Sequence, residues 1–116
     1  MFWKKYNWHK VADSEAEITF NRSGIGVVEM NDKKICVAKF KNEWRAFAYN
    51  CPHAGGVMAE GYIDLSGNIV CPVHSYKFSL KNGRSKIPEG FCLKTYPAES
   101  RKDGFFIGFE ENQQLY

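Results

Sequence analysis

Short runs of apolar and β-branched residues alternate with small polar clusters along most of this chain of 116 residues. Runs of this kind predict strands, and the polar clusters between them predict turns. No stretch shows the sustained apolar period of an amphipathic helix, so the pattern predicts an all-β fold. The expected strands are 6–11, 25–30, 35–40, 44–49, 69–70, 77–80, 91–96 and 105–109.

The residues between these runs have the chemistry of tight turns. Asn31-Asp32 separates the second and third expected strands, and Lys41-Asn42-Glu43 separates the third and fourth. Lys81-Asn82-Gly83 and Asp103-Gly104 are further turn signals near the C-terminal end. Asn, Asp and Gly tolerate the backbone conformations that tight turns require, so we expect these strands to be joined by short connections.

Two short boxes contain the residues with the most distinctive chemistry, Cys51-Pro52-His53-Ala54-Gly55-Gly56 and Cys71-Pro72-Val73-His74-Ser75-Tyr76. Each box offers one thiolate and one imidazole, in the spacings C-x-H and C-x-x-H, and seventeen residues separate the first histidine from the second cysteine. Proline fixes φ and glycine permits unusual backbone conformations, so both suit loops that hold ligands rigidly. The four expected metal ligands are Cys51, His53, Cys71 and His74.

Sulfur and imidazole ligands suit zinc and iron–sulfur centres, whereas hard cations prefer oxygen. A structural zinc site usually groups like ligands, with two cysteines followed by two histidines. Here each box mixes one cysteine with one histidine. That arrangement resembles the Rieske motif, in which two Cys hold one iron of a [2Fe-2S] cluster and two His hold the other. The mixed boxes favour an iron–sulfur centre over zinc, and zinc over an accidental grouping.

The size and composition indicate a single domain, residues 1–116, and an apolar share of 44% is enough for an ordinary packed core. The net charge of +3 comes from Lys and Arg scattered among acids, so we expect no nucleic acid as a partner. No apolar stretch approaches the ~20 residues needed to cross a bilayer, and the N-terminal residues lack the apolar region of a secretory signal. We therefore expect a cytoplasmic protein with no membrane span.

Two cysteines and one histidine remain outside the boxes. Cys36 and Cys92 lie in the apolar runs 35–38 and 91–93, so both are expected to be buried thiols and not metal ligands. His9 is far from both boxes in the sequence and is expected at the surface. The four residues of the boxes therefore complete the expected ligand set.

Nearly the whole chain resembles a bacterial Rieske-type [2Fe-2S] ferredoxin of the low-potential type. The segments that match are Trp8–Ala12, Asn50–His53, Val70–His74, Phe78, Gly83 and Thr95–Pro97. The resemblance implies a base of antiparallel sheets, formed by residues 1–49 and 80–116, and a small cluster-binding subdomain, residues 50–79, inserted between its halves. It also implies one [2Fe-2S] cluster as the cofactor and a loop at 87–90 that packs over the cluster.

The chain departs from the resemblance at Ser75, where ferredoxin-like members usually have Gly. A positive φ at this position would strain the Ser backbone. High-potential relatives also carry an extra Cys in each box, joined as a disulfide, and place a Ser and a Tyr hydroxyl against the cluster sulfurs. The matching residues here are Gly56 and Val73 for the cysteines, and Tyr76 and Phe78 for the hydroxyls. The resemblance therefore implies a low reduction potential.

The resemblance also implies a one-electron carrier, whose protein redox partners are a reductase that supplies electrons and an oxygenase or similar acceptor. Two alternatives stay open, a Rieske-like small subunit of a nitrite-reductase-type complex and a non-redox zinc-binding interaction module. A stand-alone oxygenase is excluded, because a mononuclear iron requires two His and a carboxylate and only His9 remains outside the boxes. We therefore expect an electron-transfer protein with no catalytic residues of its own.

Overall fold

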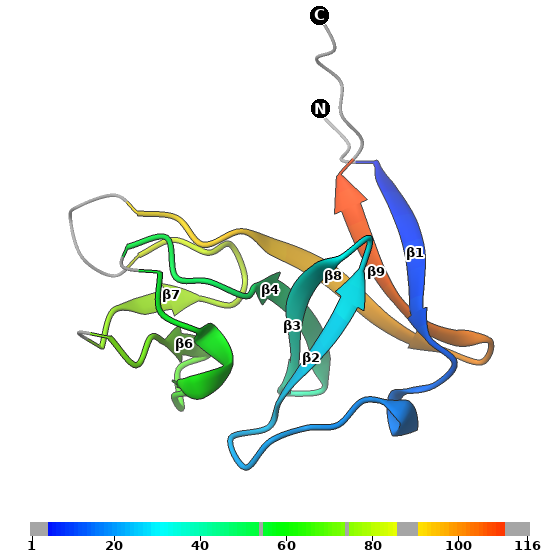
Figure 1. Ribbon diagram of the computed structural model, residues 1–116, viewed down its shortest axis with the longest axis horizontal. Coiled ribbons are helices and arrows are strands. Elements are labelled where there is room, and N and C mark those ends of the chain that lie inside the picture. Colours follow the sequence, from blue (N-terminus) through cyan, green and yellow to red (C-terminus); the bar gives the residue numbers. More distant parts are fainter. Residues whose placement is uncertain (1–4, 54, 74, 86–90, 111–116) are drawn as a thin grey trace, which may run out of the picture.

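The computed structural model describes residues 5–53, 55–73, 75–85 and 91–110, and its regular structure consists almost entirely of antiparallel β-strands (Figure 1). Two short 3-10 helices, η1 (Glu15–Glu17) and η2 (Met58–Glu60), occur in these ranges. Within the described ranges, no helix has the length and apolar character needed to span a bilayer. The strands are β1 (Tyr6–Ala12), β2 (Ile25–Met30), β3 (Lys33–Phe40), β4 (Glu43–Ala48), β5 (Tyr62–Ile63), β6 (Asn68–Val70), β7 (Lys77–Ser79), β8 (Thr95–Arg101) and β9 (Gly104–Glu110).

Six strands form one large antiparallel sheet in the order β1-β9-β8-β4-β3-β2. The turn between β2 and β3 consists of Asn31 and Asp32, with φ of 52° and 66°, and the turn between β3 and β4 consists of Lys41 and Asn42, with φ of 51° and 65°. Two successive residues with positive φ match the right-handed twist of paired strands. The predicted turns at both places are therefore confirmed.

The large sheet curls until its two edge strands, β1 and β2, come into contact. Its inner side encloses a first hydrophobic core, to which β2, β3, β4, β8 and β9 all contribute. Phe105 and Ile107 of β9 are fully buried there. The buried residues of this first core are Ile18, Val28, Ile35, Val37, Ala46, Ala98, Phe105 and Ile107.

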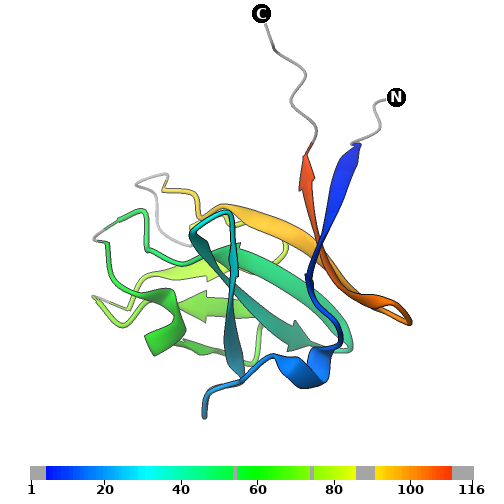
Figure 2. The same ribbon diagram turned by 45° about the vertical axis from the view of Figure 1, so that its right-hand side comes forward.

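The remaining strands form a small sheet, β5-β6-β7, which lies beside the β2–β4 part of the large sheet and away from the β1–β9 pair (Figures 1 and 2). A second hydrophobic core lies between the two sheets. Because this core includes both cysteines of the boxes, its packing fixes the boxes relative to the large sheet. Its buried residues are Ile25, Cys36, Ala38, Phe47, Cys51, Met58, Ile69, Cys71, Phe78, Leu80 and Leu93.

Polar contacts also join the two sheets. The Arg45 side chain on β4 donates from Nε to the Leu80 carbonyl at 3.0 Å and from Nη2 to the Lys81 carbonyl at 2.7 Å. At another point, the Asn21 side-chain amide donates to the Ala59 carbonyl at 2.7 Å, which connects the segment before β2 to η2. Each contact satisfies backbone carbonyls outside the strands, where no ladder partner is available.

The strand expected over 91–96 is wrong in its position, because β8 begins only near the end of that range. The backbone of the residues before β8 forms hydrogen bonds with two different segments and not with one strand. The Leu93 N–H donates to the Gly83 carbonyl at 2.8 Å, whereas the Lys94 carbonyl accepts from the Ala48 N–H at 3.0 Å. Residues 92–94 therefore cross from the small sheet to the large one.

The two cysteines outside the boxes differ in burial. Cys36 is fully buried, as expected, but the expectation for Cys92 is wrong, since its side chain is exposed. The next residue, Leu93, is only 2% exposed and packs in the second core. Successive side chains of extended backbone point to opposite sides, so a buried Leu93 directs Cys92 towards solvent. His9 is exposed on β1, as expected.

Candidate metal centre

The two boxes are loops closed by equivalent backbone hydrogen bonds. The Cys51 N–H donates to the Gly56 carbonyl at 2.7 Å, and the Cys71 N–H donates to the Tyr76 carbonyl at 2.8 Å. Each bond joins the cysteine to the fifth residue after it. The two boxes therefore repeat one local geometry, the first after β4 and the second between β6 and β7.

The fourth residue after each cysteine has left-handed backbone. Gly55 has φ of 72° in the first box, and Ser75 has φ of 56° in the second. The positive φ considered for Ser75 is thus present. A residue with a Cβ pays about 1–2 kcal/mol for this conformation, and the closure of the loop on its cysteine keeps Ser75 in it.

The two cysteine thiols of the boxes lie next to each other in the second core. Cys51 is 3% exposed and Cys71 is 0% exposed, and the two side chains are within hydrogen-bonding reach. Burial raises the pKa of the Cys71 thiol above its ordinary value, and the Cys51 thiol raises it further. The Val73 backbone N–H acts in the opposite direction, since it donates to Cys71 Sγ at 3.4 Å. Both buried thiols can lose their protons together only beside a compensating positive charge, which a metal centre provides.

The imidazole of His53 packs against aromatic rings from outside its own box. Tyr76 of the second box stacks on it, with ring centroids 3.7 Å apart and ring planes 24° apart. Phe91 meets the same imidazole edge-on, with centroids 5.2 Å apart and planes at 71°. Sequence reasoning missed this contact, because no spacing rule relates a residue of one box to a histidine of the other.

His74, the fourth expected ligand, lies outside the described residues, as do Ala54 and the loop 87–90 that was expected to pack over the cluster. Within the described ranges, no three His, Cys, Asp or Glu side chains are grouped closely enough to hold one metal ion. A Rieske cluster does not require such a group, since each of its two irons takes only two protein ligands.

The residues around the thiols fit a [2Fe-2S] cluster in their donor chemistry, and Gly56 keeps side-chain atoms away from the Cys71 sulfur. The first box has no side chain at Gly56, where a Cβ would lie 2.8 Å from Val73 Cγ2 and 3.2 Å from Cys71 Sγ. Any larger residue would press against the sulfur. Two adjacent thiols and an imidazole held in the same pair of loops are three of the four donors that a Rieske cluster needs.

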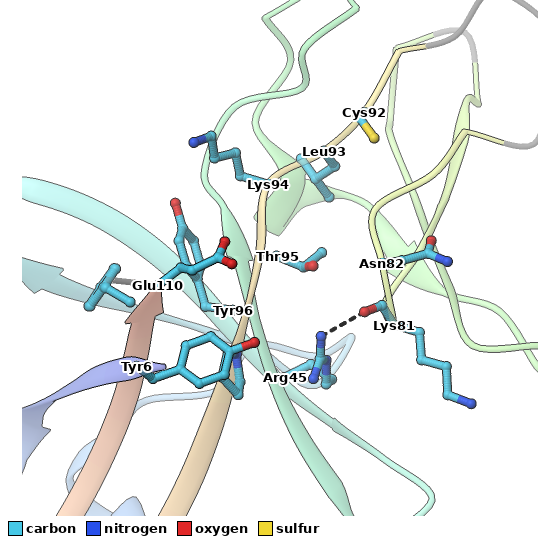
Figure 3. Close-up of a pocket in the computed structure, with 12 residues that line it drawn as sticks. Tyr6, Arg45, Lys81, Asn82, Cys92, Leu93, Lys94, Thr95, Tyr96 and Glu110 are labelled. Atoms are coloured by element: carbon cyan, nitrogen blue, oxygen red, sulfur yellow. Dashed lines mark hydrogen bonds between the residues drawn. The ribbon is translucent and has the colours of Figure 1, made fainter. Parts of the chain in front are cut away.

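A cavity of about 630 Å³ lies elsewhere, beside β4 and β8 (Figure 3). Arg45, Lys81 and Tyr96 line it, and Cys92 borders it. Among the expected ligands that the structure describes, Cys51, His53 and Cys71, none lines this cavity, so it is separate from the candidate metal centre.

The chain is similar to known proteins along most of its length. A family model described as the Rieske [2Fe-2S] domain matches residues 7–97. The ferredoxin component of the alkene monooxygenase system of Xanthobacter autotrophicus (strain ATCC BAA-1158 / Py2) is 25% identical, over 72% of this chain and 69% of that protein. The 3-phenylpropionate/cinnamic acid dioxygenase ferredoxin subunit of Escherichia coli (strain K12) is 33% identical, over 61% of this chain and 68% of that protein.

Solved structures share the fold at low sequence identity. A chain in the complex of reduced oxygenase and oxidized ferredoxin in carbazole 1,9a-dioxygenase superposes with a TM-score of 0.70 at 19% identity, covering 92% of this chain and 97% of that one. The putative NADH-dependent nitrite reductase small subunit from Mycobacterium tuberculosis gives a TM-score of 0.71 at 18% identity, covering 90% and 96%. The predicted all-β fold with antiparallel sheets is therefore confirmed.

Proposed function

This chain belongs to the Rieske [2Fe-2S] domain family and carries one [2Fe-2S] cluster, and we propose that it is a ferredoxin that passes single electrons from a reductase to an oxygenase. The observation that carries the proposal is the pair of equivalent loops that brings two buried cysteine thiols together. The ferredoxin components among its relatives support the assignment of an oxygenase as the acceptor.

We assign Cys51 and Cys71 as the ligands of one iron, and His53 and His74 as the ligands of the other. The adjacent thiols support the first pair, and the box spacing supports the second. In the same proposal, residues 50–79 form the cluster-binding subdomain, and residues 1–49 and 80–116 form the base. The second core fits this division, because it packs the small sheet and both box cysteines against β2–β4.

The bound cluster supplies reversible one-electron chemistry, and the protein determines how tightly and in what surroundings it is held. Cys51 and Cys71 keep their sulfurs in the second core, which excludes water from that side of the site. The Val73 N–H points at Cys71 Sγ and favours negative charge on that sulfur. No residue of the chain acts on a substrate in this proposal, so its function depends on protein partners.

A second candidate is the small subunit of a nitrite-reductase-type complex. The nitrite reductase small subunit superposes as well as the chain from the oxygenase complex does, with TM-scores of 0.71 and 0.70. Copurification separates the candidates: a ferredoxin is isolated alone and reduces an oxygenase, whereas a subunit is retained with the reductase. We also propose a cytoplasmic location, which the unpaired thiols of Cys36 and Cys92 support and cell fractionation would test.

The ligand assignment is tested by replacing each ligand in turn and measuring iron, sulfide and the visible spectrum. Cys51→Ala and Cys71→Ala are expected to abolish the cluster, because thiolates supply the charge that holds ferric iron. His53→Ala and His74→Ala are expected to destroy the cluster or leave it labile. The wild-type protein should be red-brown and take up one electron per cluster in a reductive titration.

The chain supplies matched controls for these variants. His9→Ala and Cys92→Ser replace the same residue types at exposed positions, so both should keep full iron and sulfide content. Normal cluster content in Cys71→Ala would contradict the ligand assignment. A colourless wild-type protein that binds zinc would contradict the function as a whole.

We expect a reduction potential near the low end of the Rieske range of about −150 to +300 mV. Gly56 and Val73 face each other across the two loops but cannot form a disulfide. Phe78 is fully buried without a hydroxyl, and the ring of Tyr76 lies flat on His53. Hydrogen bonds to cluster sulfurs stabilise the reduced state, so the replacement of the two hydroxyl donors of the high-potential relatives lowers the expected potential. A midpoint well above zero in protein-film voltammetry would contradict this expectation.

A further inference from the structure

The second box supplies an aromatic ring to the first, and the first box has no equivalent ring to offer in return. Tyr76 and Gly56 occupy equivalent positions, since each accepts the backbone N–H of the cysteine that begins its box. Tyr76 stacks on the His53 imidazole at 3.7 Å between centroids. A glycine at the matching position cannot form such a contact. The two boxes therefore share a backbone geometry at this position but differ in the side chain that they place there.

Tyr76 is held in place by its backbone and by its ring. Its carbonyl accepts from the Cys71 N–H at 2.8 Å, and the strained residue Ser75 immediately precedes it. The ring packs against the second core and has the ring of Phe91 6.2 Å away, tilted by 47°. Phe91 in turn contacts the edge of His53. A rigidly held ring therefore faces the imidazole.

We propose that Tyr76 is a positioning residue for His53, whose ring stacking fixes the plane in which the imidazole meets iron. The proposal rests on the assignment of His53 as a cluster ligand. A histidine nitrogen binds metal along the direction of its lone pair, so rotation of the ring about its side-chain bonds misdirects that nitrogen. A neighbour parallel to the imidazole within 24° permits rotation within the ring plane and opposes tilting out of it.

The stacking contact is made by the ring of Tyr76, which leads to a specific order among variants. Tyr76→Phe keeps the stacked ring and should behave like the wild type. Tyr76→Leu keeps apolar bulk but removes the flat surface, so His53 should lose its fixed plane. The interaction of an aromatic pair corresponds to a change of roughly two- to tenfold in an equilibrium or rate, which sets the size of the expected effect.

The experiment measures the two histidine nitrogen couplings of the reduced holoprotein by electron spin echo spectroscopy, and the rate of cluster loss to an iron chelator. In Tyr76→Leu, one of the two couplings should shift and cluster loss should accelerate roughly two- to tenfold. Tyr76→Phe should match the wild type in both measurements. Tyr62→Leu is the matched control, because Tyr62 is 54% exposed on β5, and it should change neither.

Unchanged couplings in Tyr76→Leu would overturn the proposal, and so would a Tyr76→Phe variant as altered as Tyr76→Leu. If Tyr76→Leu does not retain its cluster, Phe91→Leu carries the test, since it removes the ring that lies beside Tyr76 and meets the edge of His53 but leaves Tyr76 in place. A shift of one of the two couplings in Phe91→Leu supports the proposal, and an unchanged spectrum contradicts it. A wild-type spectrum without two histidine nitrogens would instead contradict the ligand assignment, so the two failures are distinguishable.

Discussion

At the scale of single residues, Ser75 places a side chain on backbone that glycine adopts more easily, with φ of 56°. Ser75→Gly should therefore raise the free energy of unfolding of the holoprotein by about 1 kcal/mol, because the release of strain exceeds the extra entropy of the unfolded chain. Denaturant unfolding followed by circular dichroism measures this change.

Ser66 provides the control for the same substitution. It lies in the turn before β6, is exposed, and is not among the residues with positive φ. Ser66→Gly should lower the free energy of unfolding by roughly 0.5 kcal/mol, since only the entropic term remains. A loss of similar size in both variants would show that Ser75 is not strained.

The two cysteines outside the boxes should differ in reactivity. Burial raises the pKa of the Cys36 thiol to about 12 from its ordinary value of 9.0, whereas Cys92 is exposed. A thiol reagent added to the holoprotein near neutral pH should therefore modify Cys92 and leave Cys36 intact. Peptide mass analysis identifies the modified residue, and Cys92→Ser should abolish the reaction. Rapid modification of Cys36 in that variant would contradict its burial.

The same raised pKa links Cys36 to stability at high pH. The folded state binds the thiol proton more tightly than the unfolded state does. The stabilisation is therefore complete below the unfolded pKa of 9.0 and is lost as the pH rises from there towards about 12. Cys36→Ala removes the titrating thiol and should flatten this part of the pH dependence of the free energy of unfolding.

At the scale of elements, Gly83 lies where the turn after β7 meets the segment before β8. Its φ is 76°, and a Cβ there would lie 1.8 Å from the Leu93 carbonyl oxygen. Gly24 has φ of 82° but no atom within 4 Å of an added Cβ. Gly24→Ala should therefore lower the free energy of unfolding by about 1 kcal/mol, and Gly83→Ala by roughly 3 kcal/mol or more. Equal losses in chemical denaturation would show that the Leu93 carbonyl moves away without penalty.

The strands of the meander β2–β4 were predictable because their signals are local. An apolar, β-branched run marks β2, alternating apolar residues mark β4, and Asn31-Asp32 marks a turn whatever surrounds it. Cys36 and Cys92 show where local signals fail. Both lie between apolar neighbours, yet β3 has a core on each face and the segment at Cys92 has one on a single face. A run of three apolar residues does not indicate whether the strand is covered by a core on one face or on both faces.

The candidate site also combines features that local sequence signals predict with features that they do not. The spacing of cysteine and histidine in the boxes indicated the ligand types and the cofactor, because metal chemistry restricts both. The stacking of Tyr76 on His53 was not predictable, since it depends on how the two loops lie relative to each other. That arrangement is set by the second core, whose buried residues are spread along the sequence from Ile25 to Leu93.

At the scale of the whole molecule, Arg45 joins the two sheets through carbonyls that no strand satisfies. Its guanidinium donates to Leu80 at 3.0 Å and to Lys81 at 2.7 Å, at the border of the cavity shown in Figure 3. Arg45→Met keeps the apolar stem and should lower the free energy of unfolding by roughly 1.5–3 kcal/mol, the range for hydrogen bonds to charged groups.

Arg22 is the control for this substitution, since it is exposed in the loop before β2. Arg22→Met should change the free energy of unfolding by less than about 0.5 kcal/mol. Thermal unfolding of both variants with the cluster bound makes the comparison. Equal stability of the two would show that the second core alone holds the sheets together.

The register of the large sheet also has a consequence for the order of folding. β2, β3 and β4 are joined by two-residue turns, so their pairing closes small loops at little entropic expense. β1 instead pairs Tyr6 with Glu110, almost the full length of the chain away. Contacts between such distant residues form slowly, because chain entropy is lost before they are made. We expect the meander to nucleate folding. The β1–β9 ladder should form last during folding and open first during unfolding.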